Sequence, residues 1–147
     1  MKYNIDNIKE SEYSEVVDVW EASVRATHHF LKEEDIQFFK PLILNEFLKA
    51  VTLSSARNEI GRIVGFMGVA NEKLEMLFIH PDMMGQGIGK QLLRHAIENL
   101  NIDKVDVNED NQTAVGFYKY FGFRAIKRSP LDGMGKPYPI LHMELTK

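Results

Sequence analysis

One stretch of the sequence constrains the fold more than any other, because it joins an apolar run, a glycine-rich turn and a helical pattern without a break. Its sequence is Leu77-Phe78-Ile79-His80-Pro81-Asp82-Met83-Met84-Gly85-Gln86-Gly87-Ile88-Gly89-Lys90-Gln91-Leu92-Leu93. Glycine adopts backbone torsions that other residues avoid, and it lets the chain approach a ligand without a Cβ atom in the way. Several N–H groups can then converge on one oxyanion at the positive end of the helix. The stretch therefore predicts an anionic ligand that carries phosphate.

The spacing of the glycines narrows the kind of phosphate site. A nucleoside-triphosphate loop has four residues between its glycines, followed by Lys and Ser or Thr. Here three residues separate Gly85 from Gly89, and Gln91 follows Lys90. A dinucleotide fingerprint has the spacing G-x-G-x-x-G, and here the third glycine is displaced by one position. Both nucleotide sites are excluded, which leaves another phosphate ligand or an ordinary glycine-rich turn into a core helix.

Length and composition predict one globular domain over residues 1–147. The chain is long enough to bury a proper core, and with 44% hydrophobic and 27% charged residues we do not expect disorder. The net charge of −3 argues against a general nucleic-acid binder, and the absence of cysteine excludes a disulfide framework or a thiolate nucleophile. With no secretory signal and no run of about 20 apolar residues, we expect a cytoplasmic protein and no membrane partner.

Alternation and helical periodicity predict an α/β order of elements. Strands are expected at Tyr3–Ile8, Val51–Ala56, Ile63–Ala70, Lys73–Ile79, Lys104–Asn108, Phe123–Arg128 and Ile140–Leu145. Helices are expected from Ser11 to about His28, over Glu33–Lys49 with a kink or a new start at Pro41, over Gly87–Leu100 and over Thr113–Phe121. Ser11 or Ser14 is expected to cap the first helix, and Gly122 to end the last one in the left-handed conformation.

A second motif follows the glycine-rich stretch. The segment from Asn111 to Phe123 is NQTAVGFYKYFGF, which taken alone is an amphipathic helix that ends at a glycine. It resembles the second motif of the GNAT N-acetyltransferase superfamily, Asn-x-x-Ala-x-x-x-Tyr-x-x-x-Gly-Phe. The glycine-rich stretch resembles that superfamily's acetyl-coenzyme A pyrophosphate loop, whose pattern is Arg or Gln, two residues, then Gly-x-Gly or Gly-x-Ala. Gly87 and Gly89 match this pattern, whereas Met84 stands at the Arg or Gln position.

The resemblance covers nearly the whole chain and implies a fold and a co-substrate. Weaker likenesses around Trp20 and in the late glycine- and proline-rich loop point to small bacterial single-domain members. The implied fold is α/β, with a mixed, mostly antiparallel central sheet that is splayed between its fourth and fifth strands and flanked by about four helices. The implied co-substrate is acetyl-coenzyme A, with its pantetheine arm in the splay. The cofactor-binding residues so implied are Leu77, Phe78, Ile79, Gly85, Gln86, Gly87, Ile88, Gly89, Lys90, Asn111 and Tyr118.

Acetyl transfer to an amine requires two proton movements. The amine must lose a proton before it attacks, since a lysine ammonium has a pKa of about 10.4, and the departing thiolate must gain one. The resemblance places the acid at Tyr118, and a purely structural core tyrosine is the alternative. One candidate base is Glu75, which strand alternation places on the apolar face of Leu77 and Ile79 unless a bulge turns it away. The other is Asp106, across the gap; either could act through water or be an ordinary strand carboxylate.

The acceptor is expected to contact the helices between Ser11 and Lys49 and the loop from Ser129 to Pro139. Candidate substrate-binding residues are Trp20, His28 and Phe30. The aromatic residues and the carboxylates of these helices are compatible with a cationic acceptor, although solvated helix faces have the same composition. The acceptor stays open between a small-molecule amine and a protein lysine or N-terminus, since a fold does not choose among them. No metal site is expected, because the histidines show no ligand spacing and neighbouring helical residues point about 100° apart.

The leading hypothesis is an acetyl-coenzyme A-dependent N-acetyltransferase that works by direct attack of the amine. The alternative is a non-catalytic acyl-coenzyme A sensor or an interaction module on the same scaffold. Met84 favours the sensor, whereas Tyr118 and the intact glycine-rich loop favour the enzyme. The oligomeric state stays open between a monomer and a homodimer.

Overall fold

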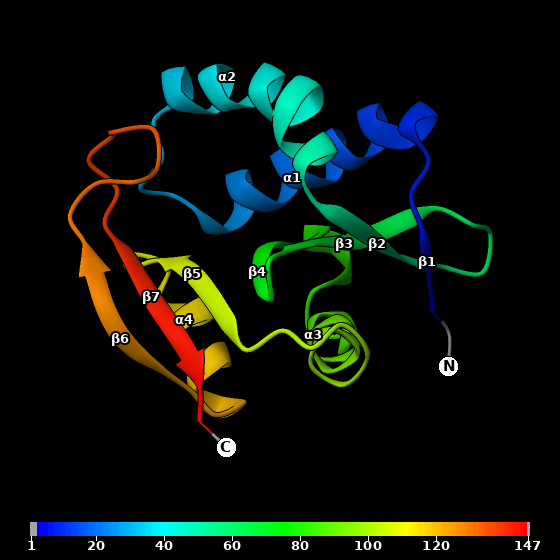
Figure 1. Ribbon diagram of the computed structural model, residues 1–147. Coiled ribbons are helices and arrows are strands. Elements are labelled where there is room, and N and C mark those ends of the chain that lie inside the picture. The colour runs from blue at the N-terminus through cyan, green and yellow to red at the C-terminus, as the bar shows by residue number, and fades with distance from the viewer. Residues whose placement is uncertain (1–2, 147) are drawn as a thin grey trace.

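The chain folds around one sheet with helices on both faces (Figure 1). The computed structural model describes residues 3–146. The strands are β1 (Asn4–Asn7), β2 (Thr52–Arg57), β3 (Ile63–Ala70), β4 (Lys73–Ile79), β5 (Lys104–Asn108), β6 (Phe123–Ser129) and β7 (Ile140–Leu145). The helices are α1 (Tyr13–Thr27), α2 (Glu33–Leu42), α3 (Ile88–Asn99) and α4 (Gln112–Tyr120). Single turns are η1 (Glu10–Glu12), η2 (Ile43–Phe47), η3 (Leu48–Ala50) and η4 (Pro81–Met83).

The sheet has the strand order β1-β2-β3-β4-β5-β7-β6. Neighbouring strands are antiparallel except β4 and β5, which run parallel. Their pairing covers only Lys73 opposite Lys104 and Leu74 opposite Val105, so the two strands separate beyond that point. The predicted mixed, mostly antiparallel sheet with a splay between its fourth and fifth strands is confirmed.

The helices bury the sheet from two sides (Figure 1). On one face, Trp20 of α1 packs in a cluster with Phe66 of β3. On the other, Leu92 of α3 and Val115 of α4 pack in a cluster with Val105 of β5. The strand β3 is therefore buried along almost its whole length, as expected where both faces of a sheet are covered. In the described part of the chain, no helix has the length and apolarity to cross a bilayer.

The predicted cap of α1 is wrong. The N-cap position is Glu12 rather than a serine, and its side chain makes no cap hydrogen bond. Instead, the Glu12 carboxylate accepts a hydrogen bond from the Lys9 N–H at 2.9 Å and from the Arg57 guanidinium at 2.8 and 2.9 Å. The bond to Arg57 is the largest reason why the pKa of Glu12 falls to about 2. A partner 45 residues away thus fixes this turn, which local cap signals cannot reveal.

Pro41 lies inside α2 and does not end it. The helix continues to Leu42, then widens to a π-helical turn in η2 and tightens to a 3-10 turn in η3. Proline has no N–H to donate to the preceding turn, which disturbs the regular ladder. The predicted helical range is therefore confirmed, with its irregularity just after the proline. Gly122 follows α4 with φ of 101°, so the predicted left-handed end of that helix is also confirmed.

Candidate active site

A β-bulge in β4 sets the position of Glu75. In the pairing with β3, Gly68 lies opposite Met76, and the next residue, Val69, lies opposite Leu74. One residue of β4 is therefore left without a partner, and that residue is Glu75. Bulges of this kind bend a strand and re-aim the side chain of the extra residue.

The bulge corrects the expected orientation of Glu75. Leu77 and Ile79 pack in the cluster beneath α3, whereas Met76 and Phe78 pack toward α1. Glu75 lines a cavity together with the second pair, so simple alternation placed it on the wrong face. Its side chain keeps 38% of its surface exposed. Desolvation of the buried part of this side chain raises the pKa of its carboxyl group.

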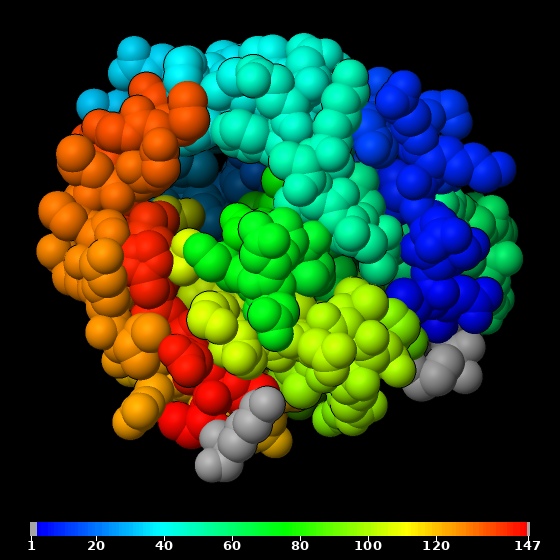
Figure 2. Space-filling model, in the orientation of Figure 1, coloured from blue at the N-terminus to red at the C-terminus, as the bar shows by residue number. Residues whose placement is uncertain are grey.

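The separation of β4 and β5 opens a cavity of about 490 Å³. A smaller cavity of about 200 Å³ lies beside it, against α1 and η2. Figure 2 shows the surface hollowed between α2, β4 and the loop that joins β6 to β7. Both cavities are lined by His28, Glu75, Met76, Phe78, Asn108 and Asp132. The two cavities therefore meet at this set of side chains, which we call the junction.

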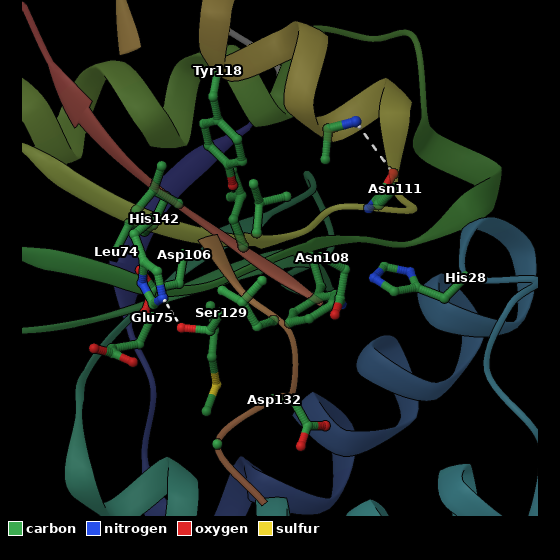
Figure 3. Close-up of a pocket in the computed structure, with 18 of the residues that line it drawn as sticks. His28, Leu74, Glu75, Asp106, Asn108, Asn111, Tyr118, Ser129, Asp132 and His142 are labelled. Atoms are coloured by element: carbon green, nitrogen blue, oxygen red, sulfur yellow. Dashed lines mark hydrogen bonds and ion pairs between the residues drawn. The ribbon is translucent and has the colours of Figure 1, made fainter. Parts of the chain in front are cut away.

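Tyr118 reaches the larger cavity from α4 (Figure 3). Its ring packs edge-on against Phe117 and Phe123, as a core tyrosine would. Its hydroxyl nevertheless points toward the cavity (Figure 3). Burial raises the pKa of Tyr118, so the hydroxyl keeps its proton throughout the neutral range and can act as a donor. Asn111 lines the same cavity, but its Oδ1 accepts a hydrogen bond from the Ala114 N–H at 3.2 Å and so caps α4.

The glycine-rich turn has the backbone of an anion site. Gly85 and Gly87 have φ of 81° and 82°, in the left-handed region. A Cβ at either position would meet nothing within 4 Å, so the torsion rather than crowding demands glycine there. Gly87 is the N-cap of α3. Because the first N–H groups of a helix have no partner within it, this end of α3 can donate to a ligand.

The other residues of the turn differ in what their side chains do. Ile88 is buried in the core, so only its backbone faces the turn. The Lys90 Nζ lies 5.5 Å from the centre of the Tyr120 ring. Gln86 accepts a hydrogen bond from the Tyr3 hydroxyl at 3.3 Å. The turn can therefore bind an anion through its main-chain N–H groups and one lysine side chain.

Asp106 belongs to a hydrogen-bonded chain that crosses three strands (Figure 3). Its Oδ1 lies 2.8 Å from His142 Nδ1 on β7, and His142 Nε2 lies 2.7 Å from Ser129 Oγ on β6. Its other oxygen, Oδ2, accepts from the Lys73 Nζ at 2.9 Å. Ser129 and His142 were not predicted as site residues, because only the register of β5, β7 and β6 brings them to Asp106.

His28 stands at the junction of the two cavities. It is 7% exposed, and burial lowers the pKa of its imidazole to about 4, so it is neutral at neutral pH. The Thr27 hydroxyl donates its only proton to the Ser23 carbonyl at 2.8 Å. Thr27 Oγ1 must then accept from His28 Nδ1, which lies 2.8 Å away. The Nε2 atom of His28 therefore carries the lone pair.

The other two predicted acceptor residues lie at different depths. Trp20 is buried and lines the smaller cavity. Phe30 lines neither of the two joined cavities; its ring lies 5.2 Å from that of His28 and 6.1 Å from that of Tyr138, beside a separate pocket. The structure thus brings Trp20 and His28 to one cavity, whereas Phe30 lies outside it, beside the imidazole ring of His28.

The loop between β6 and β7 is fastened to α2 by residues that the sequence analysis did not single out. The buried Asp35 of α2 accepts a hydrogen bond from the Tyr138 hydroxyl. It also pairs with the Lys136 Nζ at 2.9 Å. The same ammonium lies 4.3 Å from the centre of the Phe38 ring. These contacts hold the loop beside the smaller cavity and keep Asp132 at the junction.

Comparison with known proteins assigns a family to this arrangement. Residues 24–146 match the family described as "Acetyltransferase (GNAT) domain". The chain belongs to the GNAT acetyltransferase family. The resemblance that the two sequence motifs indicated is confirmed.

The relatives of this GNAT protein cover its whole fold. Peptidyl-lysine N-acetyltransferase YjaB of Salmonella typhimurium is 40% identical over 143 residues, which are 97% of this chain and 98% of that protein. The solution structure of apo YjaB from Escherichia coli has a TM-score of 0.88 at 38% identity, over 99% of each chain. PaiA N-acetyltransferase from Thermoplasma acidophilum, in complex with coenzyme A, has a TM-score of 0.74 at 20% identity, over 99% and 100% of the chains, and supports the fold alone. The chain is an N-acetyltransferase.

Proposed function

We propose that this enzyme transfers the acetyl group of acetyl-coenzyme A to the side-chain amine of a lysine in a protein. The acceptor is inferred from the peptidyl-lysine acetyltransferase that is 40% identical over nearly the full length of both chains. The donor is inferred from the two sequence motifs and from the coenzyme A complex of a protein with the same fold. A small-molecule amine and a protein N-terminus are the competing acceptors.

One observation carries the proposal: β4 loses β5 as its partner after Leu74, and the larger cavity opens there. A strand edge without a partner offers N–H and C=O groups that need hydrogen bonds. The amide-bearing pantetheine arm would supply them beside Leu77, Phe78 and Ile79. The pyrophosphate would then rest on the main-chain N–H groups of Gly85, Gln86, Gly87, Ile88, Gly89 and Lys90.

Tyr118 is the general acid in this proposal. Its hydroxyl faces the larger cavity, and burial raises the pKa of Tyr118, so the phenol is protonated at neutral pH and can donate to the sulfur as the C–S bond breaks. The amine attacks the thioester carbonyl, the C–S bond breaks, and Tyr118 protonates the sulfur.

The junction suits a cationic acceptor that enters from the smaller cavity. Glu75 and Asp132 supply carboxylates there. Among residues 3–146, Glu75 has one cationic neighbour, the Lys73 Nζ at 4.0 Å, and Asp132 forms no ion pair. Neutral His28 and the apolar wall around Trp20 would hold the aliphatic part of a lysine. For the base that receives the proton of the amine, Glu75 and Asp106 remain the carboxylate candidates.

The test is release of free thiol from acetyl-coenzyme A with a lysine peptide whose N-terminus is blocked. The control peptide carries the same sequence with the lysine Nε already acetylated. Wild-type protein should release thiol with the first peptide alone, and Tyr118→Phe should lower kcat about 100-fold while the affinity for acetyl-coenzyme A stays the same.

Three outcomes would change the proposal. An unaltered rate in Tyr118→Phe would remove that residue from the mechanism. Transfer to free amines or to peptide N-termini, with none to lysine, would replace the acceptor. Tight binding of acetyl-coenzyme A with no transfer to any amine would favour a sensor.

A further inference from the structure

The register of three strands places Ser129, His142 and Asp106 on one wall of the larger cavity (Figure 3). Asp106 of β5 lies directly opposite His142 of β7. Ser129 of β6 lies opposite Ile140, which is two residues before His142 and so on the same face of β7. This diagonal relationship brings Ser129 Oγ to 2.7 Å from His142 Nε2.

The hydrogen bonds of this wall have a defined direction. An ionised carboxylate only accepts, so His142 Nδ1 carries the proton that it donates to Asp106. In the neutral imidazole, Nε2 then has the lone pair and accepts from the Ser129 hydroxyl. The Ser129 oxygen keeps its own lone pairs for a further donor. The Lys73 Nζ on Oδ2 holds Asp106 from the other side.

We propose that Ser129 and His142 together take the proton that the ammonium of the acceptor must lose, and that Asp106 is a positioning residue for His142. The inference rests on the proposed acetyl transfer and deepens it. The oxygen of Ser129 accepts a proton from nitrogen while its own proton moves to His142 Nε2. Asp106 stabilises the imidazolium, which then releases the proton to water.

The freed lone pair of the amine forms a C–N bond with the acetyl carbon, and the C–S bond breaks. An ammonium loses two protons in becoming an amide, and the thiolate takes up one. The first proton leaves through Ser129 and His142. The second reaches the sulfur by way of Tyr118, so one proton is released overall.

Asp106 and Glu75, the two carboxylates predicted as candidate bases, have different roles in this proposal. Both oxygens of Asp106 are engaged, Oδ1 by His142 and Oδ2 by Lys73, so Asp106 orients its partner. Glu75 at the junction attracts the ammonium. Replacing Glu75 by Gln should therefore raise KM for the acceptor and leave the pH profile unchanged.

The experiment compares His142→Gln with His29→Gln, an exposed histidine outside both cavities. Rates are measured with acetyl-coenzyme A and a lysine peptide from pH 6 to 10. For His142→Gln, kcat/KM for the peptide should fall about 100-fold at neutral pH, with KM for acetyl-coenzyme A unchanged. The defect should shrink as the pH approaches about 10.4, where lysine loses its proton unaided. His29→Gln should match wild type.

The flanking residues supply matched variants. Asp106→Asn should show the same pH-dependent loss as His142→Gln, because an amide no longer fixes the tautomer of the imidazole. Ser129→Ala should lose activity and Ser129→Thr, which keeps the hydroxyl, should restore it. The charged groups next to His142 that bear on this profile are Asp106 on β5, Lys73 and Glu75 on β4, and Lys127, which is paired with His142 on β6.

A second acceptor separates proton removal from structural damage. With a fluorinated lysine analogue whose amine is already neutral at the assay pH, the defect of His142→Gln should largely vanish. An equal defect with both acceptors would overturn the proposed proton transfer through Ser129 and His142, which we call the relay.

Other results would also overturn it. One is an unchanged pH profile in His142→Gln while Tyr118→Phe is impaired; in that case acetyl transfer stands and the relay does not. Another is a pH dependence of kcat/KM for the peptide that is lost in Glu75→Gln and in no other variant. An acetyl group found on Ser129 by mass spectrometry would replace the relay by an acyl-enzyme. Absence of transfer to any amine by wild type would overturn the relay together with the proposed function.

Discussion

Leu74 and Val105 form the last pair of the parallel ladder between β4 and β5. Beyond this pair, β4 continues for five residues to Ile79 with β3 on one side and the larger cavity on the other. The polar groups on that free edge are the site at which we place the pantetheine arm.

We expect acetyl-coenzyme A to slow amide hydrogen exchange along this edge. Peptides that cover residues 75–79 and 85–90 should gain protection, because the ligand supplies hydrogen bonds that β5 does not. The control is β2, which is paired on both sides and lies away from the cavity. Equal protection of β2, or none in residues 75–79, would contradict the placement.

Replacing Gly87 by Val should abolish tight binding of acetyl-coenzyme A. The new side chain meets no atom within 4 Å, but a β-branched residue at φ of 82° is strained and would cover the N–H groups at the start of α3. Titration calorimetry should show affinity at least about tenfold weaker, since one lost hydrogen bond to a charged group is worth about 1.5–3 kcal/mol.

Gly61→Val is the matched control for backbone strain. Gly61 also has a left-handed φ, of 84°, with open space around it, but it lies in the turn between β2 and β3. Both variants should lose about 1–2 kcal/mol of unfolding free energy, whereas only Gly87→Val should lose affinity. Unchanged affinity in Gly87→Val would refute the loop as the pyrophosphate site.

Local signals in the sequence were sufficient for the elements that frame the site. The predicted bounds of β3, β4, β5 and β7 agree with the structure to the residue. In β4, for example, the turn at Asn71 and Glu72, both with positive φ, precedes the strand and Pro81 follows it. Glycine, asparagine and proline mark such boundaries because of their own torsional preferences, so distant residues are not needed to find them.

Positions that depend on pairing between distant strands could not be found in this way. The bulge at Glu75 results from a mismatch between β3 and β4, and the alternation of β4 alone gave the wrong face. His142 meets Asp106 only through the pairing of β7 with β5. The ion pair of Glu12 with Arg57 likewise joins residues 45 positions apart. In each case, the register decides which side chains meet.

The Glu12–Arg57 ion pair should make stability depend on acid pH. Because the folded state lowers the pKa of Glu12 from 4.5 to about 2, its stabilisation is complete above pH 4.5 and is lost as the pH falls toward 2. Glu12→Gln should cost about 2 kcal/mol at pH 7 in urea unfolding, and the difference from wild type should shrink at pH 3. Glu59→Gln, at an exposed position, is the control and should change little.

His28 should be neutral at neutral pH, with its proton on Nδ1. The hydroxyl of Thr27 donates to the Ser23 carbonyl and so accepts from His28 Nδ1. His95 provides an internal contrast, because the Asn99 amide nitrogen donates to its Nδ1 at 3.1 Å and leaves the proton of the neutral ring on Nε2. Long-range ¹H–¹⁵N correlation spectra should therefore show opposite tautomers for the two rings.

Titration of His28 should also appear in the stability of the fold. Burial lowers the pKa of His28 from 6.5 to about 4, so the unfolded chain binds the proton more readily between these values. Unfolding free energy should fall as the pH drops from 6.5 toward 4, and His28→Gln should remove that part of the pH dependence. A His28 resonance that titrates near 6.5 would contradict the neutral ring, and one with its proton on Nε2 would contradict the tautomer that Thr27 imposes.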